Sequence, residues 1–140
     1  MTTLQAQTDD ATLIQDAQAL LEAFARSWAA QPLFADQPPD VAALAHEDRL
    51  RNTPPGLAAS LRGLGTGVMA PLWERLGDLA MPVALVVGER DAKFRTINEE
   101  MARRIPRAAL HVVPGAGHAV HLEHPDEVAA VIATPPERTP

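Results

Sequence analysis

Residues 83–94, VALVVGERDAKF, decide how the chain folds. Val83–Val87 is a continuous apolar run of strand length, which is typical of a strand covered on both faces. The run meets Gly88, and three charged residues follow, the last of them Asp91. Asp91 is therefore either an ordinary turn residue after a buried strand or one member of a catalytic set.

The residues after this strand continue in a strand–helix pattern. A helix is predicted over 96–105, with Thr96 as its N-cap and a capping box, and a second buried strand over 109–114. The glycine loop PGAGH (114–118) and a helix from about Pro125 to Ala133 complete the pattern. Such units form parallel sheets with right-handed crossovers. Because two strands rarely make an independent sheet, we expect the sequence to be the end of a longer fold.

The residues before the strand predict helices that Pro and Gly interrupt. The expected helices lie at 10–31, 39–51, 56–62 and 70–77. The fold class is therefore α/β, and we expect four segments: a frayed start at 1–9, a helical segment at 10–80, the strand–helix segment at 81–134 and a loose tail at 135–140.

Composition excludes several classes of protein. The chain of 140 residues is 46% hydrophobic, as expected of a globular protein, and contains no cysteine, which excludes disulfides and thiolate metal sites. A net charge of −6 with scattered basic residues argues against nucleic-acid binding. No apolar run approaches the roughly 20 residues that a membrane span needs. We expect a cytoplasmic protein without a cofactor.

Two residues follow the ends of neighbouring strands. Asp91 comes after the first strand and His118 after the second. Because functional groups of open parallel sheets gather at the carboxyl ends of the strands, the two side chains are candidates for an acid–histidine pair. Taken singly, each has an ordinary explanation, Asp91 as a turn residue and His118 as a surface histidine.

The motif GERDAKF (88–94), followed by GAGHAVHLEHP (115–125), resembles the closing part of the α/β-hydrolase family. FARSWAAQPLFA (24–35) and SLRGLGTGVMAPLWERL (60–76) add a resemblance to the C-terminal part of one subfamily, the 2-succinyl-6-hydroxy-2,4-cyclohexadiene-1-carboxylate synthases of menaquinone biosynthesis. These lyases eliminate pyruvate from a polycarboxylate precursor. The resemblance implies that 10–80 is a helical cap domain with the helix leading back to the sheet.

The resemblance also implies roles for individual residues. Asp91 would be the acid of a catalytic triad and His118 its histidine. The small polycarboxylate substrate would contact a set of cap and loop residues, which are Trp28, Arg49, Arg62 and Lys93. Arg49 matches the cap arginine better than Arg51, although an insertion of two residues would reverse that match.

The nucleophile of the resembled enzymes has no counterpart in this sequence. That nucleophile is a Ser in a G-x-S-x-G elbow, whereas the two serines here, Ser27 and Ser60, lie in helical segments without flanking glycines. We therefore expect no activity from these residues alone. A separate chain that carries the elbow is one possible partner.

Several alternatives stay open or are disfavoured. The Asp–His pair would serve an ester hydrolase equally well, and a non-catalytic interaction module is a further alternative. His118, His121 and His124 are spaced by three, but the glycines before them and Pro125 after them disfavour a helical metal site. The GLGTG stretch (63–67) follows a helix, so we interpret it as a helix–helix turn and not as a phosphate loop.

Overall fold

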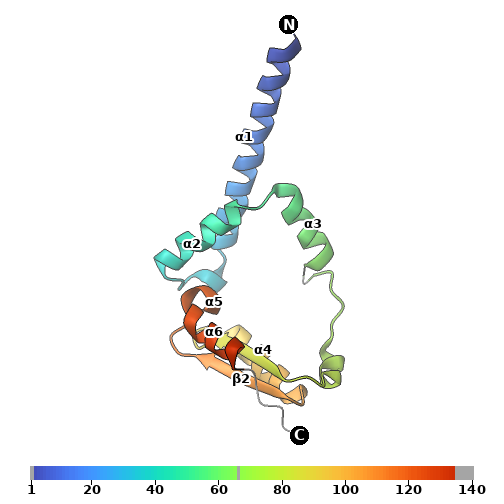
Figure 1. Cartoon of the computed structure of the whole chain (residues 1–140), viewed down its shortest axis with the longest axis vertical. Coiled ribbons are helices and arrows are strands. Elements are labelled where there is room, and N and C mark those ends of the chain that lie inside the picture. Colours follow the sequence, from blue (N-terminus) through green and yellow to red (C-terminus); the bar gives the residue numbers. More distant parts are fainter. Residues whose placement is uncertain (1, 66, 135–140) are drawn as a thin grey trace. The chain divides into compact units, whose positions relative to one another are not determined.

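A computed structural model describes residues 2–65 and 67–134, with side chains from Asp16 onward (Figure 1). The chain divides into two compact units. The first comprises Met1–Gln31 and Ala42–Met69, and the second comprises Pro32–Val41 and Ala70–Pro140. The expected tail at 135–140 lies outside the described residues.

The first unit is helical. It holds α1 (Thr2–Ala29), most of α2 (Pro39–Leu50) and α3 (Pro54–Leu64). α1 includes residues 2–9, for which we expected a frayed start; this stretch has no Gly or Pro, and Leu, Gln and Ala favour helix. α3 begins earlier than expected, because the Thr53 hydroxyl accepts a hydrogen bond from the Gly56 amide at 3.2 Å and caps the helix.

Small and medium apolar residues form the core of the first unit. Leu21 and Ala25 of α1 are buried, and so is Ala45 of α2. Glu22 and His46 connect the same two helices across 3.5 Å. The two buried residues of α1 are four positions apart, about one turn of the helix.

The second unit is built on a two-stranded parallel sheet. β1 (Val83–Gly88) pairs with β2 (Ala108–Val113) in a register that runs from Val83 opposite Ala108 to Gly88 opposite Val113. α4 (Ala92–Arg104) connects the two strands and contacts both of them (Figure 1). The predicted strand–helix–strand order is confirmed. The parallel register brings the carboxyl ends of both strands to one edge of the sheet.

The N-cap predicted for the helix between the strands is wrong. The capping residue is Asp91, whose side chain accepts a hydrogen bond from the Phe94 amide at 3.1 Å. Thr96 lies inside α4, where its hydroxyl donates to the Ala92 carbonyl oxygen at 3.0 Å, and Glu99 pairs with Arg95. Aspartate and threonine are both good N-caps, and the carboxylate of Asp91 is also held by its contact with His118.

Short helical segments complete the second unit. They are two 3₁₀ turns, η1 (Pro32–Phe34) and η2 (Trp73–Asp78), and two α-helices, α5 (Val120–Glu123) and α6 (Pro125–Ala133). The α-helix expected over 70–77 is therefore a 3₁₀ turn, which agrees with Pro71 before it and Gly77 within it. α6 has the predicted bounds. Val113, Ala116 and Val120 form the core beside the strand ends, with Val86 and Val128 packed against it.

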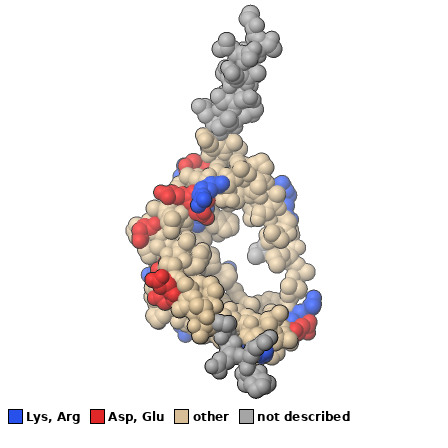
Figure 2. All heavy atoms as spheres, viewed as in Figure 1, with Lys and Arg blue, Asp and Glu red and all other residues tan. Residues whose placement is uncertain are grey.

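Charged side chains are dispersed over the surface. Figure 2 shows acidic and basic residues of the described chain scattered on the face drawn. Arg104 and Arg103 hold the pKa of the exposed Glu100 carboxyl below its ordinary value through hydrogen bonds. None of the described helices has the length and apolarity to cross a membrane.

Candidate active site

The two carboxylate oxygens of Asp91 contact different partners. Oδ1 accepts the Phe94 amide hydrogen at 3.1 Å and caps α4, while Oδ2 lies 2.6 Å from Nδ1 of His118. The residue is only 8% exposed. Capping fixes the carboxylate in place, so the same contact that starts the helix aims the second oxygen at the histidine.

His118 lies in the glycine loop after β2 and is enclosed by two aromatic rings. The Phe94 ring lies 4.7 Å from the imidazole, centroid to centroid, and the Phe34 ring meets it edge-on at 5.6 Å. Lys93 is exposed, and its Nζ lies 5.5 Å from the centroid of Phe94. Because Nδ1 faces a carboxylate, the tautomer with a hydrogen on Nδ1 leaves Nε2 as the acceptor.

Backbone contacts bring the glycine loop against the end of β1. The amides of Glu89 and Arg90 donate to the carbonyls of Val113 and Ala116 at 3.0 and 2.9 Å, which continues the pairing beyond the strands. A Cβ at Gly88 would collide with the carbonyl oxygens of Ala116 and Gly117. Glycine at position 88 is therefore required for the close approach of the two strand ends.

A buried carboxylate on α5 holds the same loop from the other side. The Glu123 side chain is 2% exposed. It accepts the amide hydrogens of Gly117 at 2.7 Å and Ala119 at 3.2 Å, and Arg90 donates to it at 3.4 Å. Glu89 likewise accepts the Gly115 amide hydrogen at 2.9 Å. All three charges after β1 thus engage the segment that carries His118, directly or through Glu123.

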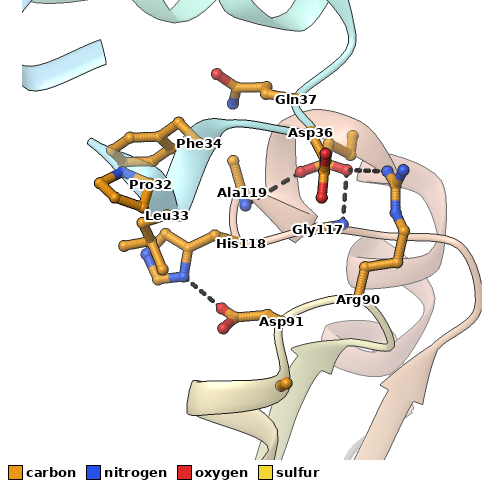
Figure 3. A pocket seen from close by; sticks show the side chains of 12 residues that line it. Pro32, Leu33, Phe34, Asp36, Gln37, Arg90, Asp91, Gly117, His118 and Ala119 are labelled. Carbon is orange, nitrogen blue, oxygen red and sulfur yellow. Dashed lines mark hydrogen bonds and ion pairs between the residues drawn. The ribbon is translucent and has the colours of Figure 1, made fainter. Parts of the chain in front are cut away.

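A pocket of about 130 Å³ opens beside the imidazole, within the second unit (Figure 3). Its lining comes from η1 and the residues after it, from the end of β1 and from the glycine loop; it consists of Pro32, Leu33, Phe34, Asp36, Gln37, Arg90, Asp91, Ala92, Gly117, His118, Ala119 and Glu123. Nε2 of Gln37 is buried and has no hydrogen-bond partner among the described residues.

The predicted site residues fall into both units. Asp91 and His118 are brought together, and Lys93 lies next to them along α4. A second group, from the expected cap domain, belongs to the first unit: Trp28 on α1, Arg49 on α2 and Arg62 on α3. Trp28 is 37% exposed, with its ring 5.7 Å from Phe24, and Arg62 is exposed. Substrate contacts by this second group stay a prediction.

Sequence reasoning did not single out four of the residues that shape the pocket. They are Phe34, Gln37, Arg90 and Glu123. The sequence did give one indication of Glu123, because the stretch GAGHAVHLEHP (115–125), which resembles the α/β-hydrolase family, includes it. The sequence gave no indication of Gln37, because a glutamine in a proline-rich loop is typical of an exposed turn.

The described His, Asp and Glu side chains were also compared with the arrangement that a metal ion needs. No group of three His, Asp or Glu side chains within 16–65 and 67–134 is arranged to hold a metal ion. The pKa of the Glu127 carboxyl lies below its ordinary value, first because of a hydrogen bond with its own backbone and second because of its contact with Nδ1 of His124 at 3.3 Å. The geometry is that of an acid–histidine pair, which can orient and stabilise a base.

Comparison with known proteins agrees with this geometry. The family model described as the alpha/beta hydrolase family matches residues 4–131. The chain belongs to the α/β-hydrolase family. The two parallel strands and the helices are the part of this fold that the structure contains.

Two curated relatives carry the name of one enzyme. A Bacillus subtilis protein, provisionally named 2-succinyl-6-hydroxy-2,4-cyclohexadiene-1-carboxylate synthase, is 44% identical over 108 residues, which is 75% of this chain and 39% of that protein. A Salmonella typhimurium protein named as the same synthase is 36% identical over 114 residues, 81% of this chain and 43% of that protein. The chain thus spans less than half the length of these relatives.

Two solved structures are also similar to this chain. The structure of MenH from S. aureus has a TM-score of 0.75 and 29% identity, covering 95% of this chain and 53% of that one. A carboxylesterase structure from Nitrososphaera gargenis has a TM-score of 0.58 and 26% identity, covering 94% of this chain and 47% of that one. The resemblance to the synthases predicted from the sequence motifs is confirmed.

Proposed function

We propose that this chain supplies the acid, the histidine and the cap residues of a lyase that eliminates pyruvate, as the 2-succinyl-6-hydroxy-2,4-cyclohexadiene-1-carboxylate synthases do. One observation carries the proposal: Nδ1 of His118 lies 2.6 Å from the buried carboxylate of Asp91, at the edge of a pocket. The similarity to proteins named as this synthase supports it.

The pair would act as the base of the elimination. Nε2 of His118 would accept a proton released from a carbon of the succinyl-bearing substrate, either directly or through a serine. The electron pair of the broken C–H bond would form a new C=C bond, and the C–O bond to the departing pyruvate would break. Asp91 would hold the imidazole in the required tautomer and stabilise the imidazolium.

The nucleophile would come from residues outside this sequence. Ser27 and Ser60 are exposed helical residues of the first unit. Neither lies in a G-x-S-x-G elbow, and the chain has no cysteine. We therefore propose that a segment with the elbow, on the same polypeptide or a separate one, completes the site. Residues 10–80 would then contribute the cap domain, in which Trp28 and Arg49 would help to hold the substrate and Arg49 would bind a carboxylate.

A chimera tests this proposal. In the Bacillus subtilis relative, the matched stretch is replaced by the corresponding residues of this chain, and pyruvate release is measured with the polycarboxylate precursor. We expect release by the chimera and none above background by this chain alone. His118→Ala should abolish release, whereas His121→Ala, which removes an exposed histidine of α5, should not. A chimera that is folded but inactive, or one that is indifferent to His118→Ala, would contradict the proposal.

Ester hydrolysis is the second candidate, because the same pair can activate a serine for acyl transfer. The similarity to a carboxylesterase structure favours it. The chimera is therefore also assayed with short p-nitrophenyl esters. Turnover of the esters without release of pyruvate would replace the lyase assignment by a hydrolase one.

A further inference from the structure

Gln37 stands apart from the other polar residues of the pocket. Its Nε2 atom is buried and finds no hydrogen-bond partner within the described chain, although the residue belongs to the pocket lining. In Figure 3 the amide nitrogen is directed to the side on which Phe34 and Ala119 lie. Buried amide donors without a partner are rare, because each costs about 1–3 kcal/mol. A hydrogen-bond acceptor from a ligand would relieve that cost.

The charges around Gln37 indicate which acceptor fits. Three carboxylates line the pocket, from Asp36, Asp91 and Glu123, against one described cation, Arg90. Arg90 already pairs with Glu123 at 3.4 Å. A further anion would therefore meet net negative charge. A neutral acceptor, such as a carbonyl oxygen, can take the hydrogen of a neutral amide without that repulsion.

We propose that Gln37 binds the carbonyl oxygen of the ligand and so places the carbon next to that carbonyl at Nε2 of His118. The inference rests on the proposed function for its chemical step and adds a positioning residue for the substrate. As the proton passes from that carbon to Nε2, the electron pair of the C–H bond moves toward the carbonyl oxygen. The hydrogen bond from the Gln37 amide then stabilises the negative charge that develops on the carbonyl oxygen.

A titration with cyclohexanone tests the binding step without turnover. The chain is labelled with ¹⁵N, and the side-chain amide signals of Gln37 and the ring signals of His118 are followed by NMR. We expect a saturable shift of both, because cyclohexanone is neutral and carries one carbonyl. Cyclohexanecarboxylate, which has a similar ring but is anionic, should bind at least fivefold more weakly.

Two matched variants make the test specific. Gln37→Leu should weaken cyclohexanone binding about fivefold, the value of one ordinary hydrogen bond, while the Asp91–His118 signals stay unchanged. Gln31→Leu alters an exposed glutamine and should change nothing. Equal binding by Gln37→Leu, no shift of the Gln37 amide, or tighter binding of the carboxylate would each overturn the inference. Saturable ketone binding together with an inactive chimera would reject the proposed function and keep this subsite.

Discussion

At the scale of single residues, Asp91 combines a structural and a chemical role. Its Oδ1 starts α4 and its Oδ2 contacts His118. The two roles can be separated, because an asparagine caps a helix as well as an aspartate does but cannot offer a carboxylate to an imidazole.

Asp91→Asn should therefore leave the fold almost intact and disable the base. We expect the free energy of unfolding to change by less than about 1 kcal/mol, since the Phe94 amide keeps an acceptor. In the chimera, pyruvate release should fall roughly a thousandfold, because the amide no longer fixes the tautomer of His118. ¹⁵N chemical shifts of the imidazole would report the change of tautomer directly.

Asp91→Ala is the matched comparison. It loses the cap as well as the carboxylate, so it should cost about 1 kcal/mol more in stability than the asparagine variant while its activity is equally low. If the asparagine variant retained pyruvate release near that of the parent, Asp91 would be a capping residue only.

The pairing of Asp91 with His118 could be predicted because it depends on chain topology. Parallel strands bring their carboxyl ends together, and both residues follow a strand end in the sequence. The position of Gln37 could not be predicted. It depends on how the loop after η1 comes to line the same pocket as His118, which lies far along the sequence, and no local pattern encodes that arrangement.

At the scale of elements, the approach of the glycine loop to β1 determines where His118 lies. The strands and α6 could be predicted from apolar runs and from Pro125. The start of α4 could not, since Asp91 and Thr96 are both good N-caps and only the tertiary contact with His118 distinguishes them. The same limit applies to α5, which is one turn long and is held by Glu123.

Gly88→Ala tests the role of this close approach. The added methyl group would collide with two carbonyl oxygens of the glycine loop, and backbone atoms cannot rotate away as a flexible side chain can. We expect the free energy of unfolding to fall by about 3 kcal/mol. We also expect the NMR signals of the His118 ring to show a weaker hydrogen bond to Asp91. Urea denaturation followed by circular dichroism measures the first effect.

Gly63→Ala provides the control within the same chain. Gly63 lies in α3, and an added Cβ would meet no atom within 4 Å. Alanine favours helix, so this variant should be neutral or up to about 1 kcal/mol more stable. Equal destabilisation by both substitutions would mean that the loop contact at Gly88 does not matter for stability.

At the scale of the whole molecule, the two units differ in the apolar side chains that they bury, as far as the described side chains show. In the second unit, Val87, Ile105 and Val113 are 3–5% exposed. The first unit buries Leu21, Ala25 and Ala45. Large apolar side chains stay open in both, among them Leu64 at 75% and Ile132 at 74% exposure. Apolar burial is the main source of stability, so the second unit should be the more stable one.

Urea denaturation can follow each unit separately, because each contains one of the two tryptophans. Trp28 belongs to the first unit and Trp73 to the second. In Trp73→Phe, fluorescence reports the first unit, and in Trp28→Phe it reports the second. We expect the Trp28 signal to change at a lower urea concentration than the Trp73 signal, and a total free energy of unfolding near or below about 5 kcal/mol. Coincident midpoints in the two variants would instead indicate a single cooperative structure. A total free energy of unfolding well above about 5 kcal/mol would mean that the exposed apolar residues reduce the stability of the chain only slightly.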